Sequence, residues 1–114
     1  MGRNTGDLLQ GTLGLLILKA LAGEERHGYG IAYWIQGITG DVLQIEEGSL
    51  YPALRRLEDR GFVESRWGLS ENNRRARYYA ITTDGRQHLH ADASGWVRFA
   101  RAVMTVLEAE PSVV

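Results

Sequence analysis

The sequence predicts an α+β fold that is mainly α, in a chain of 114 residues. Four segments carry apolar residues at helical spacing, two adjacent segments carry the pattern of a β-hairpin, and the last helical segment is unusually long. A chain of this length fits one domain. Because it contains no cysteine, a disulfide framework, a thiolate zinc site and a cysteine nucleophile are excluded.

The first helix is predicted from residue 7 to 22. One face carries apolar residues at 4-3-4 spacing, namely Leu9, Leu13, Leu16 and Ala20. Leu8, Leu15 and Leu18 lie off this face, so we expect burial on more than one side, with another subunit as the second cover. Gly23 is the expected helix stop.

The second helix is predicted from residue 28 to 39, after a polar connector at residues 24–27. Ile31, Ile35 and Ile38 should face the core. Gly40 and Asp41 should end the helix. Residues 42–45 are β-prone but few, which predicts either an edge strand or an extended link.

The third helix is predicted to begin between Glu46 and Ser49 and to end at Arg60, with Gly61 as a left-handed stop. Pro52 is expected in the first turn, where a missing N–H group costs little. One arc of this helix is apolar and holds Leu50, Ala53, Leu54 and Leu57. The opposite arc holds Gly48, Ser49, Tyr51, Pro52, Arg55, Arg56 and Asp59.

A β-hairpin should follow, with strands at residues 62–68 and 77–81. Val63, Ser65 and Trp67 share one face of its first strand. Asn72 and Asn73 lie at the centre of the polar loop, and asparagine accepts the left-handed geometry of a tight turn.

The last helix is predicted over residues 83–109, before Pro111. It carries a seam of the coiled-coil kind, made of Leu89, Ala93, Trp96, Ala100, Val103 and Leu107. Since no further segment is left to cover this seam, the sequence predicts a homodimer.

This order of elements predicts a winged helix-turn-helix, in which the third helix enters the major groove of DNA and the hairpin forms the wing. The charge distribution agrees. The formal net charge is −1, yet residues 55–77 hold seven arginines against four acidic residues. Such a cluster is otherwise a solvated surface, but here it coincides with the predicted helix and wing, which favours nucleic acid.

Four blocks of sequence are also recognisable in order. They are Leu13–Leu18, His27–Ile31, Gly48–Glu58 with Arg60-Gly61, and Asn73–Tyr79 with Ile81–Arg86. Through them, from Leu8 to about Leu107, the chain resembles the PadR family of bacterial transcriptional regulators, particularly its small members with one C-terminal helix. Many members have glycine near the hairpin tip, where Asn72 and Asn73 serve the same turn geometry here.

The resemblance implies a sequence-specific, dimeric DNA-binding regulator, usually a repressor of nearby genes. Residues 1–82 would form the winged helix-turn-helix domain, and residues 83–114 the dimerisation helix and tail. The matching DNA-binding positions are Tyr29, Ser49, Tyr51, Pro52, Arg55, Arg56, Arg74, Arg75 and Arg77. The expected dimer interface consists of Leu8 and Leu15 from the first helix and of the seam residues Leu89, Ala93, Trp96, Ala100, Val103 and Leu107.

Three of these assignments have alternatives. Tyr29 either meets a phosphate or packs beside Tyr33 and Trp34. Arg77 either binds DNA or braces the hairpin through Glu64. Some small family members bind flat aromatic compounds between interface tryptophans, so Trp96 is either a platform for a small aromatic ligand that relieves repression or a dimer-core residue.

Other function classes are less well supported. A winged helix that binds a protein instead of DNA is the main alternative. An enzyme is not expected, because Gly28-Tyr29-Gly30 is only half of a dinucleotide fingerprint. His88 and His90 diverge by about 200° on a helix and cannot share a metal, so no metal or cofactor is predicted. Neither a signal peptide nor a membrane span is recognisable, which predicts a cytoplasmic protein without a membrane partner.

Overall fold

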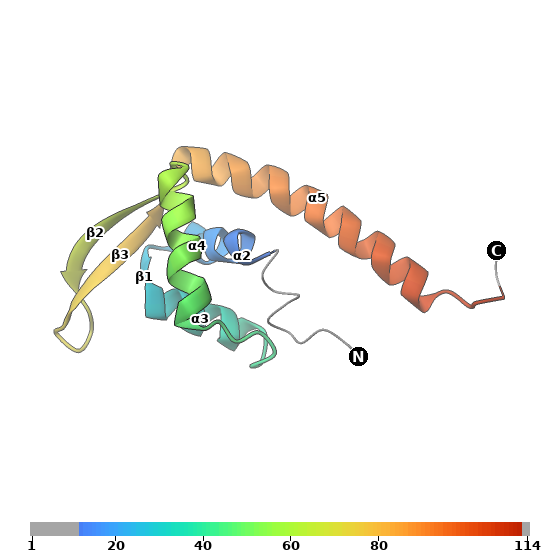
Figure 1. Cartoon of the computed structure of the whole chain (residues 1–114), viewed down its shortest axis with the longest axis horizontal. Helices are drawn as coiled ribbons and strands as arrows, with labels where there is room; N and C mark the ends of the chain where they lie inside the picture. Colours follow the sequence, from blue (N-terminus) through green and yellow to red (C-terminus); the bar gives the residue numbers. More distant parts are fainter. Residues whose placement is uncertain (1–11, 113–114) are drawn as a thin grey trace.

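The computed structural model describes residues 12–112 (Figure 1). Helix α2 (Leu13–Gly23) leads through the short strand β1 (Arg26–His27) into α3 (Gly28–Ile38) and α4 (Glu47–Asp59). Strands β2 (Val63–Leu69) and β3 (Arg75–Ile81) form the hairpin, and α5 (Thr83–Glu108) follows. The three strands form one antiparallel sheet in the order β1-β3-β2. The predicted class, a mainly helical winged helix-turn-helix with a long C-terminal helix, is confirmed.

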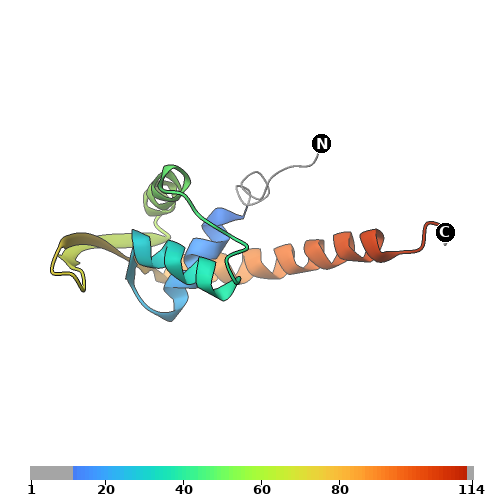
Figure 2. The same ribbon diagram turned by 90° about the horizontal axis from the view of Figure 1, so that it is seen from below.

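The core lies where α2, α3 and α4 meet the base of the hairpin. Its largest fully buried side chains are Ile17, Leu18, Leu21, Ile31, Leu50 and Leu54. The hairpin and α5 project from this core on opposite sides (Figures 1 and 2). The fold therefore leaves two separate surfaces, one between the hairpin and the helices and one along α5.

Helix α2 is more central than the sequence predicts. Leu13 and Ala20 are buried as expected, whereas Leu16 is half-buried and residues 7–11 lie outside the described part of the chain. Leu18 is only 1% exposed within a single chain, so the prediction that another subunit covers it is wrong. The reason is that α3, α4, α5 and β3 all pack around α2. Gly23 is the last helical residue, but the turn that follows is extended and left-handed geometry is not used.

The region around α3 departs from prediction in two places. Ile31 and Ile35 are buried, but Ile38 is 67% exposed because α3 ends there, beyond the core. Residues 42–45 form the extended link and not an edge strand. The third strand is instead β1, in the predicted polar connector, where Arg26 and His27 pair with Tyr79 and Tyr78.

Helix α4 has the two arcs that the sequence predicts. Leu50, Ala53, Leu54 and Leu57 are buried and all seven residues of the opposite arc are exposed. Gly61 has a φ of 81° and ends the helix as expected. Pro52 is in the second turn and not the first, because the helix begins at Glu47. Because proline has no N–H group, the Gly48 carbonyl oxygen one turn earlier lacks its helical hydrogen bond. Gly48 is exposed, so water can reach this oxygen.

The junction between the hairpin and α5 is tightly packed. The backbone N–H of Thr82 donates to the Phe62 carbonyl (3.0 Å), and the Thr82 hydroxyl donates to the Gly61 carbonyl (2.7 Å). The same hydroxyl accepts from the Gly85 N–H (3.0 Å) and so caps α5. A Cβ at Gly85 would lie 2.1 Å from the Phe62 carbonyl oxygen, so only glycine fits this close approach.

Candidate nucleic-acid interface

The outer face of α4 carries five of the predicted DNA-binding residues. Ser49, Tyr51, Pro52, Arg55 and Arg56 are all exposed, because the apolar arc holds the other side of the helix in the core. Within residues 12–112, no carboxylate forms an ion pair with Arg55 or Arg56. Both guanidinium groups therefore remain available to an external anion.

Tyr51 joins α4 to the beginning of α3. A Cβ at Gly28 would fall 2.7 Å from the Tyr51 hydroxyl oxygen, so the glycine makes room for this side chain. Burial, and secondarily the charge of Glu47, raises the pKa of Tyr51. The phenol is thus a neutral donor at physiological pH. The close approach of the Tyr51 ring therefore accounts for glycine at position 28.

Tyr29 is 68% exposed at the start of α3 and stacks on Tyr33, with ring centroids 6.2 Å apart. The Trp34 ring instead faces the guanidinium of Arg26, 5.4 Å away. Of the two predicted neighbours, Tyr29 therefore packs beside Tyr33 and not Trp34, and Tyr29 remains on the surface. His27 caps this helix, because its Nδ1 accepts from the Gly30 N–H at 2.9 Å.

One face of the hairpin, here called the inner face, looks toward α4. The strand register places Ser65, Trp67 and Leu69 on it from β2, opposite Tyr79, Arg77 and Arg75 from β3. Asn73 in the loop has a φ of 60°, as the predicted turn geometry requires. Arg75 belongs to β3 and not to the loop in which it was predicted, so its position is fixed by the strand.

Arg77 is held both by Ser65 on the neighbouring strand of its hairpin and by Glu58 on α4. Its Nε donates to the Ser65 hydroxyl (2.9 Å), and its Nη2 lies 3.5 Å from a carboxylate oxygen of Glu58. The same Glu58 oxygen accepts from the Ser65 hydroxyl at 2.7 Å. The prediction that Glu64 braces Arg77 is wrong, because Glu64 is opposite Ala80 and points to the other face of the hairpin.

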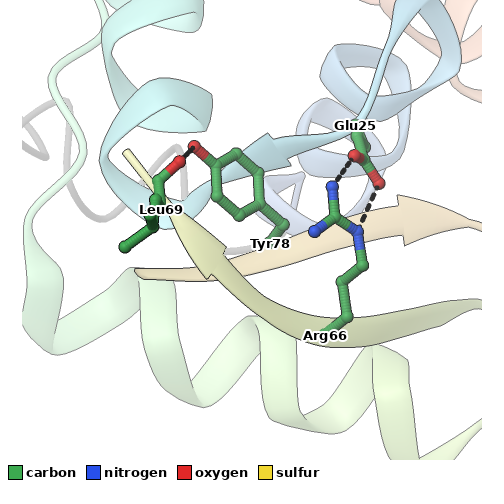
Figure 3. Close-up of polar contacts among 4 residues, drawn as sticks. All are labelled: Glu25, Arg66, Leu69 and Tyr78. Atoms are coloured by element: carbon green, nitrogen blue, oxygen red, sulfur yellow. Dashed lines mark hydrogen bonds and ion pairs between the residues drawn. The ribbon is translucent and has the colours of Figure 1, made fainter. Parts of the chain in front are cut away.

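On the outer face of the hairpin, the polar side chains of Arg66 and Tyr78 bind partners within the same chain (Figure 3). The Glu25 carboxylate binds Arg66 through both oxygens, and the Tyr78 hydroxyl donates to the Leu69 carbonyl at 2.9 Å. The Arg66 guanidinium also lies over the Tyr78 ring, 5.1 Å from its centroid. Arg66 is thus neutralised on the side away from α4.

A groove of about 1140 Å³ separates the wing from the beginning of α3 and from α4. It brings together five predicted residues, Tyr29, Tyr51, Arg74, Arg75 and Arg77. Ser49, Pro52, Arg55 and Arg56 lie outside its lining, on the exposed arc of α4. Arg26 and Trp67 also line the groove, and sequence reasoning did not select either as a site residue. The sequence signal that could have identified Trp67 is the alternation of side chains along β2, which puts Trp67 on the same face as Ser65.

The side chains of the predicted dimer seam differ widely in their exposure within a single chain. Leu89 packs on the core, Ala93 and Ala100 are half-buried, and Leu107 is 77% exposed. Trp96 and Val103 are also exposed, while Leu8 lies outside the described residues. Leu15 and Trp96 line one groove of about 480 Å³ between α2 and α5.

Two kinds of site are not seen in the part of the chain that the structure describes. Residues 12–112 contain no helix with the length and apolar character needed to cross a membrane. They also contain no cluster of three or more histidine, cysteine or acidic side chains able to hold a metal ion.

Comparison with known proteins gives a consistent picture. Residues 17–91 match the model of the transcriptional regulator PadR-like family. The negative transcriptional regulator PadR of Bacillus subtilis is 30% identical over 74 residues, which cover 65% of this chain and 41% of that protein. A transcriptional regulator from Clostridium thermocellum has a TM-score of 0.79 and 29% identity, over 90% of this chain and 99% of the other.

A PadR-like transcriptional regulator from Bacillus cereus is similar over 91% of this chain and 99% of its own, with a TM-score of 0.77 and 27% identity. The family match spans well over half of the sequence and agrees with the winged-helix architecture. The chain belongs to the PadR-like family of transcriptional regulators.

Proposed function

We propose that this regulator binds double-stranded operator DNA as a homodimer and represses transcription. The observation that carries the proposal is a set of exposed arginines on the outer arc of α4 and on the wing. Among them, Arg55, Arg56, Arg74 and Arg75 have no ion-pair partner within residues 12–112. Unpaired arginines on the helix and wing complement the phosphate backbone of a duplex.

Each residue type suits a particular contact. A guanidinium presents a planar fork of donors that fits the O6 and N7 atoms of guanine or a phosphate, which suits Arg55 and Arg56 on α4. The Ser49 and Tyr51 hydroxyls can donate to phosphate oxygens and fix the orientation of the helix. Pro52 stiffens the same exposed turn.

Dimerisation is supported by the apolar surface of α5. Trp96, Phe99, Val103, Met104 and Leu107 are between 39% and 77% exposed in a single chain. Apolar exposure along one helix is typical of a protein–protein interface. Two copies related by a twofold axis present two α4 helices to half-sites about 34 Å apart, one turn of the duplex.

A ligand that relieves repression is proposed at the same interface, with Trp96 as the platform. Trp96 is 46% exposed and lines the groove that Leu15 also lines, so a planar aromatic compound can stack on it. The alternative is that Trp96 only fills the dimer core. The name of the Bacillus subtilis relative, a negative regulator, supports repression as the outcome of DNA binding.

The test is a fluorescence-anisotropy titration with two labelled duplexes, one from the region upstream of this protein's own gene and one of scrambled sequence. We expect at least a ~10³-fold preference for the upstream duplex. In vitro transcription from the same region should fall when the protein is added. Equal, weak binding to both duplexes contradicts the proposal and favours the winged helix as a protein-binding module.

A further inference from the structure

Trp67 is a large aromatic side chain that the wing leaves 55% exposed on its inner face. Its ring is covered in part by two cations. The guanidinium carbon of Arg75 lies 4.4 Å from the ring centroid, and that of Arg77 lies 5.8 Å away. The register explains this arrangement, because Trp67 is directly opposite Arg77 and one step along the same face from Arg75.

The wing arginines differ in what remains available for an external ligand. Arg77 directs Nε to Ser65 and Nη2 to Glu58, and Arg66 is held by both oxygens of Glu25. Arg75 makes no side-chain hydrogen bond or ion pair among residues 12–112, and its guanidinium lies over the Trp67 ring. A cation–π contact uses no acceptor atom, so the N–H groups of the Arg75 guanidinium remain unpaired among the described residues.

We propose that Trp67 is a positioning residue, which holds the Arg75 guanidinium through a cation–π contact so that its unpaired N–H groups can bind a phosphate of duplex DNA. This inference rests on the proposed DNA-binding function. A free arginine loses much rotamer freedom when it binds, whereas a stacked one is already partly ordered. Trp67 therefore acts through Arg75, and its effect on DNA binding disappears when Arg75 is removed.

The test is a double-mutant cycle with the full-length protein and the upstream duplex as probe. Trp67→Leu keeps an apolar side chain without a π face, and we expect duplex affinity to fall about two- to fivefold per wing. Arg75→Ala should lower the slope of log affinity against log salt by about one per protomer. Trp67→Leu in the Arg75→Ala background should have no further effect, and Trp67→Phe should restore most of the affinity.

Several outcomes overturn the inference. An unchanged affinity for Trp67→Leu shows that the stack does not matter for binding. An equal loss for Trp67→Leu with and without Arg75 shows that Trp67 contacts DNA itself or supports the wing in general. If the unmodified protein shows no salt-dependent duplex binding, the proposed function fails together with the inference. Binding by the unmodified protein with no effect of Trp67→Leu overturns the inference alone.

Discussion

The Glu58 carboxylate on α4 lies 3.5 Å from the Arg77 guanidinium on β3, and Ser65 hydrogen-bonds to both side chains. This triad joins the helix expected to read the DNA to the wing expected to hold its backbone. Both charged groups are partly exposed, so the pair contributes little to stability by itself. Its structural effect is to fix the wing relative to α4.

Glu58→Gln should release Arg77 and remove one negative charge from the interface. We expect affinity for an unrelated duplex to rise a few-fold and its salt dependence to steepen, because Arg77 becomes free to meet a phosphate. The preference for the upstream duplex should fall, since the wing is less fixed. Anisotropy titrations of both duplexes at two salt concentrations measure this. Unchanged affinities for both duplexes would show that the triad does not influence DNA binding.

Arg55→Ala should weaken binding to the upstream duplex by ~1–3 kcal/mol if Arg55 reads a base. Arg66→Ala is the matched control, because Arg66 is also a partly exposed arginine but is paired with Glu25 on the outer face of the hairpin. The control should bind like the unmodified protein. Equal losses in the two variants would show that overall charge, and not position, governs binding.

Gly85→Ala should destabilise the fold by ~2 kcal/mol or more, because the new Cβ would meet the Phe62 carbonyl oxygen. Gly95→Ala in the same helix is the control, since nothing lies within 4 Å of its Cβ position. It should stabilise α5 by up to ~1 kcal/mol through helix propensity. Urea unfolding followed by circular dichroism measures both, and a stable Gly85→Ala variant would show that the junction is looser than described.

Val103→Glu should dissociate the proposed dimer, because it places a charge on the apolar seam of α5. Thr105→Glu, two positions away and so on the other side of the helix, is the control. Light scattering at micromolar concentration should give twice 12.7 kDa for the unmodified protein and for the control, and 12.7 kDa for Val103→Glu. A mass of 12.7 kDa for the unmodified protein contradicts dimerisation.

Planar aromatic compounds should quench tryptophan fluorescence, and Trp96→Ala should abolish the quenching. Trp34→Phe and Trp67→Phe should retain it, because those rings lie at the groove beside the wing. Quenching that survives Trp96→Ala would move the ligand site from the α5 interface to that groove.

The periodicity of apolar residues predicted most of the helices. The partition of α4 into Leu50, Ala53, Leu54 and Leu57 on one side and its polar arc on the other follows from the helical repeat alone. Strand β1 escaped prediction because two residues are too few for a pattern, and their pairing depends on contact with β3. Burial of Leu18 likewise depends on how many elements pack around α2.

The contacts within the candidate site were harder to predict than the segments that form it. Arginine clustering located α4 and the wing, but the alternation of β2 could not show that Glu58, from a different element, pairs with Arg77. The role proposed for Trp67 depends on the register that places it beside Arg75 and Arg77. Such partners are set by tertiary structure, which local sequence patterns do not encode.

Salt dependence of duplex affinity tests the central claim most directly, because phosphate contacts release counterions when they form. If the dimer makes on the order of six phosphate contacts, affinity for the upstream duplex should fall ~10³-fold between about 50 and 200 mM salt. Affinity that does not change over this range would contradict DNA binding through the arginines of α4 and the wing.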